Sequence, residues 1–381
     1  MNKCWYGSQF KLGVLGGGQL GRMLIQETVN YDVQVHCLDP DADAPCKDIA
    51  HSLTIGSLND FDTVYQFGKN KDIITVEIEN VSIQALEKLE SEGIKVFPQP
   101  AVLKIIRDKG LQKQFYAEHA IPTSPFYLVN NKDEISKYLS EFPFMQKIRT
   151  GGYDGKGVTP LLSSYDIESA FDDPSILEKF VDFEKELSVI VARNENGETK
   201  VYPTVECEFS SEANLVEFLF SPADVSPEIE KSAEELAIRI IDKLGMVGIL
   251  AVELFLTRDG QLLVNEIAPR PHNSGHHTIE CNLTSQFEQH MRSVLNLPLG
   301  DTRIIQPGVM INLLGEKGYQ GTAIYQGLED AIAISGVKPH IYGKAETKSF
   351  RKMGHITIVA PTLKEAKSTG RKVMGMVKVI A

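Results

Sequence analysis

Two glutamates stand in neighbouring apolar runs on either side of a turn. The runs are residues 249–257 and 261–267, and they contain Glu253 and Glu266 respectively. If Asp259-Gly260 forms a two-residue hairpin turn, counting along the strands places Glu253 directly opposite Glu266. The two side chains then share one face, with Cβ atoms about 5 Å apart.

Like charges that face each other across a hairpin are destabilising unless something compensates them. The pair can take up a proton or bind a hard cation such as Mg²⁺, held jointly with phosphate oxygens. Asn265 points to the other face unless the strand bulges, in which case its carbonyl oxygen could join the metal ligands. An acid pair neutralised by neighbouring Lys or Arg is the alternative.

A lysine and a glycine-rich loop supply the opposite charge. Residues 142–149 read as a strand that carries Lys147, and the loop after it contains Gly151, Gly152, Gly155 and Gly157 together with Lys156. Glycines expose backbone amides, and the lysines can offset a polyphosphate, so we expect a flap over ATP. The Walker pattern is absent, and a surface hairpin with solvated lysines is the alternative.

A second glycine cluster follows the first expected strand. Residues 16–21 read Gly-Gly-Gly-Gln-Leu-Gly, and Asp39 ends the second strand. Such glycines allow a phosphate to approach a helix start, and an acid at Asp39 suits the ribose of a dinucleotide. A nicotinamide enzyme, another phosphate site and plain helix packing all remain open at this point.

These residues need elements to hold them. Strands at 12–15, 33–38 and 73–76 alternate with helices at 20–29 and 83–89, which predicts parallel βαβ units. A Pro-bounded stretch at 97–100 precedes a helix at 101–119. Strands and tight turns then dominate, apart from a helix at 229–244 capped by Gly245. Short strands near 309–313, 332–334 and 355–359 and a helical tail complete the chain.

Composition narrows the class of protein. The chain has 381 residues, 42% hydrophobic and 24% charged, which predicts two or three globular domains. Its net charge of −12 argues against nucleic-acid binding, and no apolar run reaches membrane-spanning length. Five scattered cysteines read as reduced thiols, and no targeting segment is evident, so a cytoplasmic location is expected.

Three motifs together resemble one family of ligases. They are Gly-Gly-Gln-Leu-Gly at 17–21, Gly-Gly-Tyr-Asp-Gly-Lys-Gly at 151–157, and Asn-Glu-Ile-Ala-Pro-Arg-Pro-His-Asn-Ser-Gly-His at 265–276. With Glu-Lys-Phe-Val at 178–181, they look like the N5-carboxyaminoimidazole ribonucleotide synthetases of the ATP-grasp superfamily. The resemblance implies an N-terminal Rossmann-like parallel sheet at 1–105, an ATP-grasp domain at 106–300 and a small β-rich C-terminal domain at 301–381.

The resemblance also implies roles for individual residues. Catalysis would rest on Lys147, Arg270 and His272, and the Mg²⁺ ions, expected to be two, on Glu253 and Glu266. ATP would be bound by Lys109, Lys147, Tyr153, Asp154, Gly155, Lys156, Gly157, Glu178, Lys179, Phe180, Val181, Glu186, Asn265 and Glu266. The ribonucleotide would be bound by Gln19, Leu20, Glu79, Tyr153, Asp154, Arg270, His272, Asn273, Ser274, Lys344, Arg351 and Lys352. For the last three, a solvated basic surface is the alternative.

Two positions depart from the family pattern. Lys109 stands where members commonly have an Arg that contacts ATP, which keeps the charge but loses the bidentate fork. Phe209 stands shortly after Glu206 where many members have His. The departure at 209 leaves the contribution of the 206–214 loop to ATP binding open.

The implied reaction is the ATP-dependent carboxylation of 5-aminoimidazole ribonucleotide by bicarbonate, through carboxyphosphate, in purine biosynthesis. A homodimer that passes its product to a separate mutase is expected. The alternatives are another ATP-grasp ligase, such as a formate-dependent glycinamide ribonucleotide transformylase, a nicotinamide dehydrogenase, or a non-catalytic nucleotide sensor.

Overall fold

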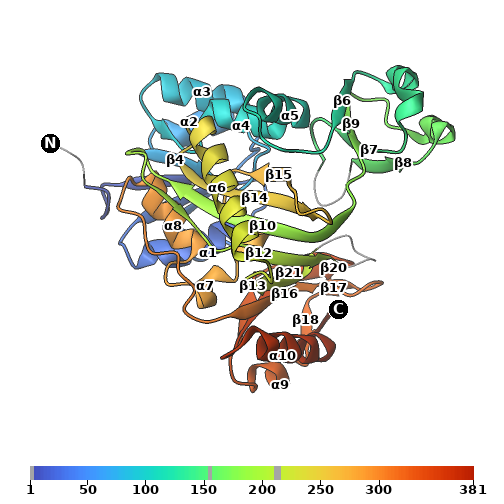
Figure 1. Cartoon of the computed structure of the whole chain (residues 1–381). Coiled ribbons are helices and arrows are strands. Elements are labelled where there is room, and N and C mark those ends of the chain that lie inside the picture. The colour runs from blue at the N-terminus through green and yellow to red at the C-terminus, as the bar shows by residue number, and fades with distance from the viewer. Residues whose placement is uncertain (1–3, 153–156, 210–215) are drawn as a thin grey trace.

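The N-terminal part of the chain is a parallel sheet with helices on both faces (Figure 1). The computed structural model describes residues 4–152, 157–209 and 216–381. The strands are β1 (Lys11–Leu15), β2 (Gln34–Asp39), β3 (Ser52–Ile55), β4 (Ile73–Val76) and β5 (Lys95–Val96), in the order β3-β2-β1-β4-β5. The helices are α1 (Gln19–Val29), α2 (Phe61–Gly68) and α3 (Ile83–Ser91). The predicted βαβ pattern is confirmed.

The central strand β1 explains why both faces are covered. Leu12 and Val14 belong to one buried cluster together with Leu24 of α1. Leu15 belongs to a second cluster, which contains Leu86 of α3. Because successive strand residues point to opposite faces, an apolar strand needs packing partners on both sides.

The helix expected at 101–119 is instead two helices, α4 (Pro100–Arg107) and α5 (Lys109–Glu118). Asp108 separates them with extended backbone angles, and its side chain accepts hydrogen bonds from the amides of Gly110 and Leu111. An aspartate that caps a helix start satisfies amides that have no partner within the helix. The break therefore begins α5 at Lys109, and it places that residue in the first turn.

A separate four-stranded sheet projects from the body of the molecule (Figure 1). Its strands are β6 (Phe126–Val129), β7 (Phe144–Ile148), β8 (Val158–Leu161) and β9 (Ser175–Lys179), in the order β6-β9-β7-β8. Two 3₁₀ segments, Lys132–Glu141 and Ser164–Ser169, cover it. Phe144 and Leu177 lie in its own small core. This lobe carries Lys147 on β7 and Glu178 on β9.

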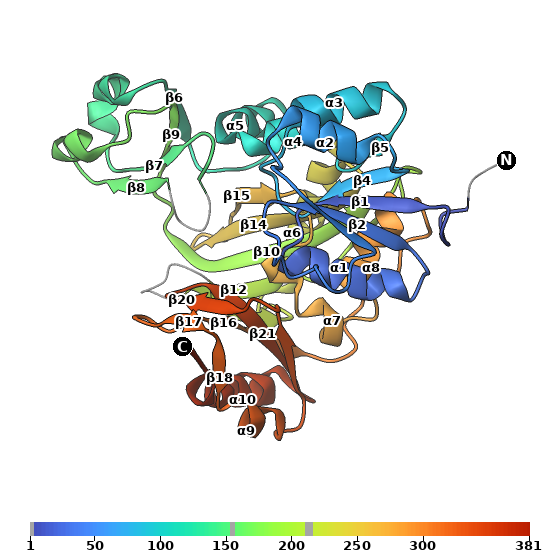
Figure 2. The same ribbon diagram turned by 180° about the vertical axis from the view of Figure 1, so that it is seen from behind.

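The largest sheet has nine antiparallel strands and runs through the centre of the molecule (Figure 2). They are β10 (Phe183–Arg193), β11 (Thr199–Val201), β12 (Val205–Phe209), β13 (Val216–Ser221), β14 (Gly248–Thr257), β15 (Leu262–Ala268), β16 (Gly308–Leu314), β19 (Val337–Ile341) and β21 (Lys352–Val359). Their order is β15-β14-β10-β12-β13-β16-β21-β19, with β11 beside β10.

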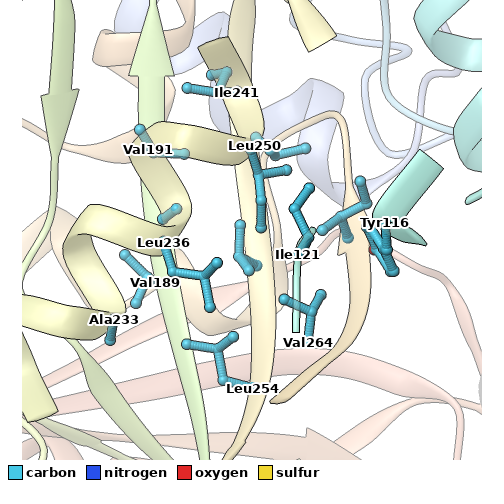
Figure 3. Close-up of a cluster of buried hydrophobic side chains, with 14 of the residues drawn as sticks. Tyr116, Ile121, Val189, Val191, Ala233, Leu236, Ile241, Leu250, Leu254 and Val264 are labelled. Carbon is cyan, nitrogen blue, oxygen red and sulfur yellow. The ribbon is translucent and has the colours of Figure 1, made fainter. Parts of the chain in front are cut away.

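The long helix α6 (Pro227–Leu244) packs on one face of this sheet. Figure 3 shows its Ala233, Leu236 and Ile241 turned toward Val189 of β10 and Leu250 of β14. The helix ends at Gly245, whose φ of 58° is left-handed. Glycine adopts that conformation without steric cost, so the predicted helix and its cap are both confirmed.

Three C-terminal strands, β16, β19 and β21, extend the central sheet. The strand expected at 332–334 is wrong, because helix α9 (Leu328–Ile332) ends there. The remaining elements are α7 (Thr278–Cys281), α8 (Gln286–Val294), β17 (Gln320–Thr322), β18 (Ile324–Gln326), β20 (Glu346–Lys348), α10 (Leu363–Met376) and β22 (Lys378–Ile380). In the described part of the chain, no helix combines the length and apolarity needed to cross a membrane.

Candidate active site

The two hairpin glutamates do lie opposite each other. Glu253 on β14 pairs with Glu266 on β15, and the register shifts immediately beside this pair. Asn265 is the extra residue at the shift, and its Oδ1 accepts a hydrogen bond from Lys147 Nζ at 3.2 Å. The strand therefore bulges, which turns the Asn265 side chain toward the lysine.

The turn of this hairpin differs from the predicted one. Thr257 and Gln261 form the last pair, with the Thr257 amide donating to the Gln261 carbonyl at 2.9 Å, so the loop holds three residues, 258–260. Gly260 supplies the left-handed position with φ +82°. This longer loop shifts the register by one residue and the bulge shifts it back, which is why the predicted Glu253–Glu266 pair is correct although the two-residue turn is wrong.

The acid pair is electrostatically asymmetric. Glu266 Oε1 lies 2.7 Å from Lys109 Nζ. Burial alone would raise the pKa of Glu266, but the nearby Lys109 ammonium holds that pKa below its ordinary value. For Glu253, burial raises the pKa to about 7, and the charges of Glu266 and Glu186 act in the same direction. Lys109 thus neutralises Glu266. Glu253 has no such lysine partner in the part of the chain that the structure describes and is repelled by two other carboxylates, so its surroundings suit a bound cation.

Glu178 forms a buried ion cluster with two lysines. Its Oε2 lies 2.9 Å from Lys147 Nζ, and its Oε1 lies 3.1 Å from Lys113 Nζ. Burial would raise the pKa of Glu178, yet the two ammonium groups hold it at about 2. Lys113 was not predicted as a site residue. Its position one helical turn after Lys109 on α5 was the available signal, since residues four apart share a helix face.

The rest of the expected linker joins the projecting lobe to the central sheet. Lys179 ends β9, and its Nζ lies 2.9 Å from Glu141 Oε2 and 4.7 Å from the centre of the Phe144 ring. The Lys179 ammonium therefore contacts residues of the projecting lobe itself. Phe180 and Val181 follow as irregular chain before β10, and the Phe180 side chain is exposed.

Glu186 lies on β10, the strand that pairs with β14. Burial raises the pKa of this carboxyl group to about 7. On the neighbouring strand β12, Glu206 pairs with Lys185 at 3.0 Å. Phe209 ends that strand, and residues 210–214 of the loop considered above lie outside the described residues.

The segment after β15 brings polar side chains to the other side of Glu253. His272 Nε2 lies 3.6 Å from Glu253 Oε1, and Arg270 Nε lies 2.9 Å from Glu79 Oε1. Burial, with the nearby charges of Arg270 and Lys352, lowers the pKa of His272 to about 3. Asn273 and Ser274 begin a short 3₁₀ turn for which His272 is the N-terminal cap. The structure thus brings Glu79, Arg270, His272 and Ser274 together beside the acid pair.

Three amides of the first glycine cluster donate to carboxylates of the protein itself. The amide of Gly17 donates to Asp39 Oδ2 at 2.7 Å, and the amides of Gly18 and Leu20 donate to Glu77 at 2.6 and 3.0 Å. Internal carboxylates already satisfy the start of α1. Of the three interpretations left open by the sequence, these contacts favour plain helix packing, and Asp39 has a structural role in them. Gln19 begins α1 beside this turn.

The three basic residues of the C-terminal part lie near one another in sequence and structure. Lys344 Nζ donates to the Lys352 carbonyl at 2.7 Å, and Arg351 Nη1 donates to the Glu346 carbonyl at 2.6 Å. Lys352 begins β21, and its charge acts on His272. The charge of Lys352 is therefore close enough to lower the pKa of His272.

The stem of the glycine-rich loop is anchored to α5. Arg149 forms a bidentate ion pair with Asp108 at 2.7 and 2.6 Å, and the Ile148 amide donates to the Gly157 carbonyl at 2.9 Å. Gly151 and Gly157 have left-handed φ values of +83° and +74°. The expected contacts of Tyr153, Asp154, Gly155 and Lys156 lie outside the described residues.

Three family models match successive parts of the chain. They describe a ribonucleotide synthetase preATP-grasp domain (residues 10–107), an ATP-grasp domain (114–287) and a phosphoribosylaminoimidazole carboxylase C-terminal domain (308–369). The N5-carboxyaminoimidazole ribonucleotide synthase of Bacillus subtilis is 39% identical over 91% of this chain and 91% of its own length. The chloroplastic phosphoribosylaminoimidazole carboxylase of Vigna aconitifolia is 40% identical over 94% of this chain, which spans 65% of that longer relative.

Solved structures of the same family also superpose on this chain. The N5-carboxyaminoimidazole ribonucleotide synthetase of Thermotoga maritima superposes with a TM-score of 0.90 at 41% identity, covering 98% of this chain and 99% of that one. An Aspergillus clavatus N5-carboxyaminoimidazole synthase in complex with ADP and 5-aminoimidazole ribonucleotide superposes with a TM-score of 0.88 at 35% identity, covering 97% and 98%.

Proposed function

Since the chain belongs to the N5-carboxyaminoimidazole ribonucleotide synthase family of ATP-grasp ligases, we propose that it carboxylates 5-aminoimidazole ribonucleotide with bicarbonate at the expense of ATP. The product would be N5-carboxyaminoimidazole ribonucleotide, an intermediate of purine biosynthesis. The relative bound to ADP and 5-aminoimidazole ribonucleotide supports this choice of substrates.

One observation carries the proposal: Glu253 stands between two groups of side chains with different chemistry. On one side lie Glu266 and Asn265, and Asn265 is hydrogen-bonded to Lys147. These three side chains suit a polyphosphate and its cation. On the other side lies His272, 3.6 Å away, at the start of the segment beside Arg270. A phosphoryl donor and an acceptor could therefore meet at Glu253, as group transfer requires.

For ATP, we assign the phosphates to Lys147 and Lys109 and the ribose to the Glu186 carboxyl group. Residues 178–181 join the projecting lobe to the central sheet, so a nucleotide base beside them would lie between the two. Residues 151–157 would close over the phosphates, as a glycine-rich loop anchored by Arg149 allows. Lys109 forms an ion pair with Glu266 in this structure, so it would have to give up part of this contact in order to bind the ATP phosphates.

The oxygen atoms of Glu253, Glu266 and Asn265 fit Mg²⁺, which prefers such hard ligands. Among the described residues, no group of three or more His, Cys, Asp or Glu could hold a metal by itself. Phosphate oxygens would have to complete the coordination, which suits two Mg²⁺ ions bound with ATP. When bound, these ions would neutralise charge on the phosphates.

For the ribonucleotide, we assign the imidazole and ribose to the cluster of Glu79, Arg270, His272, Asn273 and Ser274, with Gln19 and Leu20 at the start of α1. The Leu20 amide already donates to Glu77, so its contribution would be through its side chain. We assign the ribonucleotide phosphate to Lys344, Arg351 and Lys352, because the charge of Lys352 acts on His272, Lys344 donates to the Lys352 carbonyl, and Arg351 precedes Lys352 in the chain. Tyr153 and Asp154 are proposed on the resemblance alone.

In the proposed reaction, a bicarbonate oxygen attacks the γ-phosphorus of ATP and the bond to the bridging oxygen breaks, releasing ADP. The carboxyphosphate that results has an activated carboxyl carbon. The exocyclic amine of the ribonucleotide attacks this carbon, phosphate leaves, and the amine loses a proton. Lys147 and Lys109 would stabilise the phosphoryl charge, while Arg270 and His272 would orient the carboxyl group.

Several further points belong to the same proposal. We place the domain boundaries at 1–105, 106–300 and 301–381, a division supported by the three matched family models. A homodimer, a cytoplasmic location and transfer of the product to a separate mutase are proposed as well.

The test is to mix the protein with ATP, Mg²⁺, labelled bicarbonate and 5-aminoimidazole ribonucleotide. Acid-labile label in the product, together with one ADP released per label incorporated, is expected. A parallel reaction with formate and glycinamide ribonucleotide tests the rival ligase. ADP release in that reaction alone would refute the proposed substrates.

A further inference from the structure

A line of hydrogen-bonded side chains leads from β10 to His272, which lies beside the acid pair. Ser188 is 1% exposed, and its Oγ lies 2.7 Å from the Oγ of Ser274, which is 2% exposed. Ser274 Oγ lies 2.9 Å from His272 Nδ1, and His272 Nε2 lies 3.6 Å from Glu253 Oε1. Ser188 is also the direct strand partner of Glu253. Ser188 therefore begins this line and is also the strand partner of the glutamate at its other end, although neither the motifs nor the resemblance singled it out.

The direction of these hydrogen bonds follows from one backbone donor. The Ser274 amide donates to His272 Nδ1 at 3.4 Å, and an amide N–H can only donate. Nδ1 must then be the acceptor nitrogen, so the neutral imidazole carries its hydrogen on Nε2. The Ser274 hydroxyl can only donate to Nδ1 as well, which leaves its oxygen free to accept from the Ser188 hydroxyl. The line runs one way, from Ser188 to Ser274 to His272.

We propose that Ser188 is a positioning residue: by donating to Ser274, it commits the Ser274 hydroxyl to His272 Nδ1 and so presents Nε2–H of His272 to the carboxyl group activated beside Glu253. Without Ser188, the Ser274 hydroxyl could turn and accept from Nδ1–H, which would allow the other tautomer. The identity of the group that meets Nε2–H rests on the proposed function, whereas the tautomer does not.

Ser188 is not needed for packing. Its neighbours Leu187 and Val189 fill the core cluster that α6 covers, on the opposite face of β10. A buried hydroxyl is costly unless it is hydrogen-bonded, and alanine would occupy the same place at no such cost. The serine is therefore explained by its bond to Ser274.

The test combines a spectroscopic and a kinetic measurement on the full chain. In protein labelled with ¹⁵N-histidine, the His272 signals are assigned by their loss in His272→Gln. Wild type is expected to show the Nε2–H tautomer, and Ser188→Ala a mixture of both. With 5-aminoimidazole ribonucleotide, Ser188→Ala should lower kcat about fivefold, the effect of one neutral hydrogen bond, while the KM for ATP stays unchanged.

Two further variants separate positioning from a general loss of structure. Ser188→Thr keeps the hydroxyl and should restore the wild-type tautomer and most of kcat. Ser221→Ala removes another fully buried serine hydroxyl, one without a hydrogen-bond partner among the described residues, and should change neither measurement.

An Nδ1–H tautomer in the wild-type protein would overturn the proposal, and this result does not depend on whether Ser188→Ala folds. An unchanged tautomer and unchanged kcat in Ser188→Ala would overturn it too. If the wild-type tautomer is as expected but 5-aminoimidazole ribonucleotide is not turned over, the hydrogen-bond assignment is supported and the proposed function fails.

Discussion

Replacing Glu178 with glutamine should destabilise the protein far more than replacing Lys113 with methionine. Glu178 lies 3.1 Å from Lys113 Nζ and 2.9 Å from Lys147 Nζ, and it is 4% exposed. Glu178→Gln leaves two buried ammonium groups without an anion, whereas Lys113→Met leaves a balanced pair of Glu178 and Lys147. Leaving a buried charge uncompensated costs about 3–5 kcal/mol, so we expect that range for Glu178→Gln.

The expected effect of Lys113→Met is small because this lysine is itself costly to keep charged. Burial lowers the pKa of Lys113 from 10.5 to about 8. At about 1.4 kcal/mol per pH unit, this corresponds to a penalty of about 3 kcal/mol at pH 7, which the methionine variant escapes. The attraction to Glu178 is already included in this pKa, and the variant loses in addition the hydrogen bonds from Lys113 Nζ to Thr123 and Ser124. These opposed effects should leave the free energy of unfolding within about 1.5 kcal/mol of wild type.

The stability difference between wild type and Glu178→Gln should depend on pH. A lysine whose pKa is lowered in the folded state destabilises the protein fully below that pKa, and the penalty vanishes as pH rises to the unfolded value of 10.5. In Glu178→Gln the pKa of Lys113 falls further, so its ammonium releases its proton at a lower pH than in wild type. The stability deficit of this variant should therefore narrow by about 1 kcal/mol between pH 7 and pH 8.

Urea unfolding followed by circular dichroism at pH 7 and pH 8 measures all three proteins under the same conditions. The expected order of midpoints at pH 7 is wild type close to Lys113→Met, and both well above Glu178→Gln. A Glu178→Gln midpoint equal to or above that of Lys113→Met would show that the cluster does not depend on its carboxylate.

Four further predictions address ligand binding and turnover. Glu266→Gln should lower turnover at least about a hundredfold, and it should cost less stability than Glu178→Gln because the Glu266 side chain is 48% exposed; normal ATP consumption would contradict the metal assignment. Arg351→Ala should raise the ribonucleotide KM about tenfold and leave ATP affinity unchanged; equal KM values would remove Arg351 from the phosphate site. Lys109→Arg should lower the KM for ATP about threefold, because the guanidinium can make two hydrogen bonds to the ATP phosphates. The unfolding midpoint of the variant serves as the control for stability. Because burial raises the pKa of Glu186 to about 7, its carboxylate forms as pH rises through 7. Glu253 ionises in the same range, so ATP affinity should increase from pH 6 to pH 8 in wild type and increase less steeply in Glu186→Gln, as titration calorimetry can measure.

The sequence by itself predicted the parts that depend on short-range patterns. The alternation of strands and helices, the Gly245 cap, the opposition of Glu253 and Glu266, and the segment around Arg270 all follow from periodicity, turn chemistry or contiguous motifs. Strand pairing in a hairpin is determined within a few residues of the turn, so it could be counted, although the count had two errors that cancelled at the Asn265 bulge.

Only the tertiary structure decided which distant residues complete the site. Glu77 meets the amide of Gly18 across 59 positions of sequence, and Ser188 meets Ser274 across 86. Whether a glycine turn binds a ligand phosphate or an internal carboxylate depends on which strand ends beside it, and no local pattern contains that information. Lys113 likewise belongs to the site because a separate lobe brings Glu178 over α5. Residue types determine which chemistry is possible, but contacts between elements far apart in the chain determine which groups carry it out.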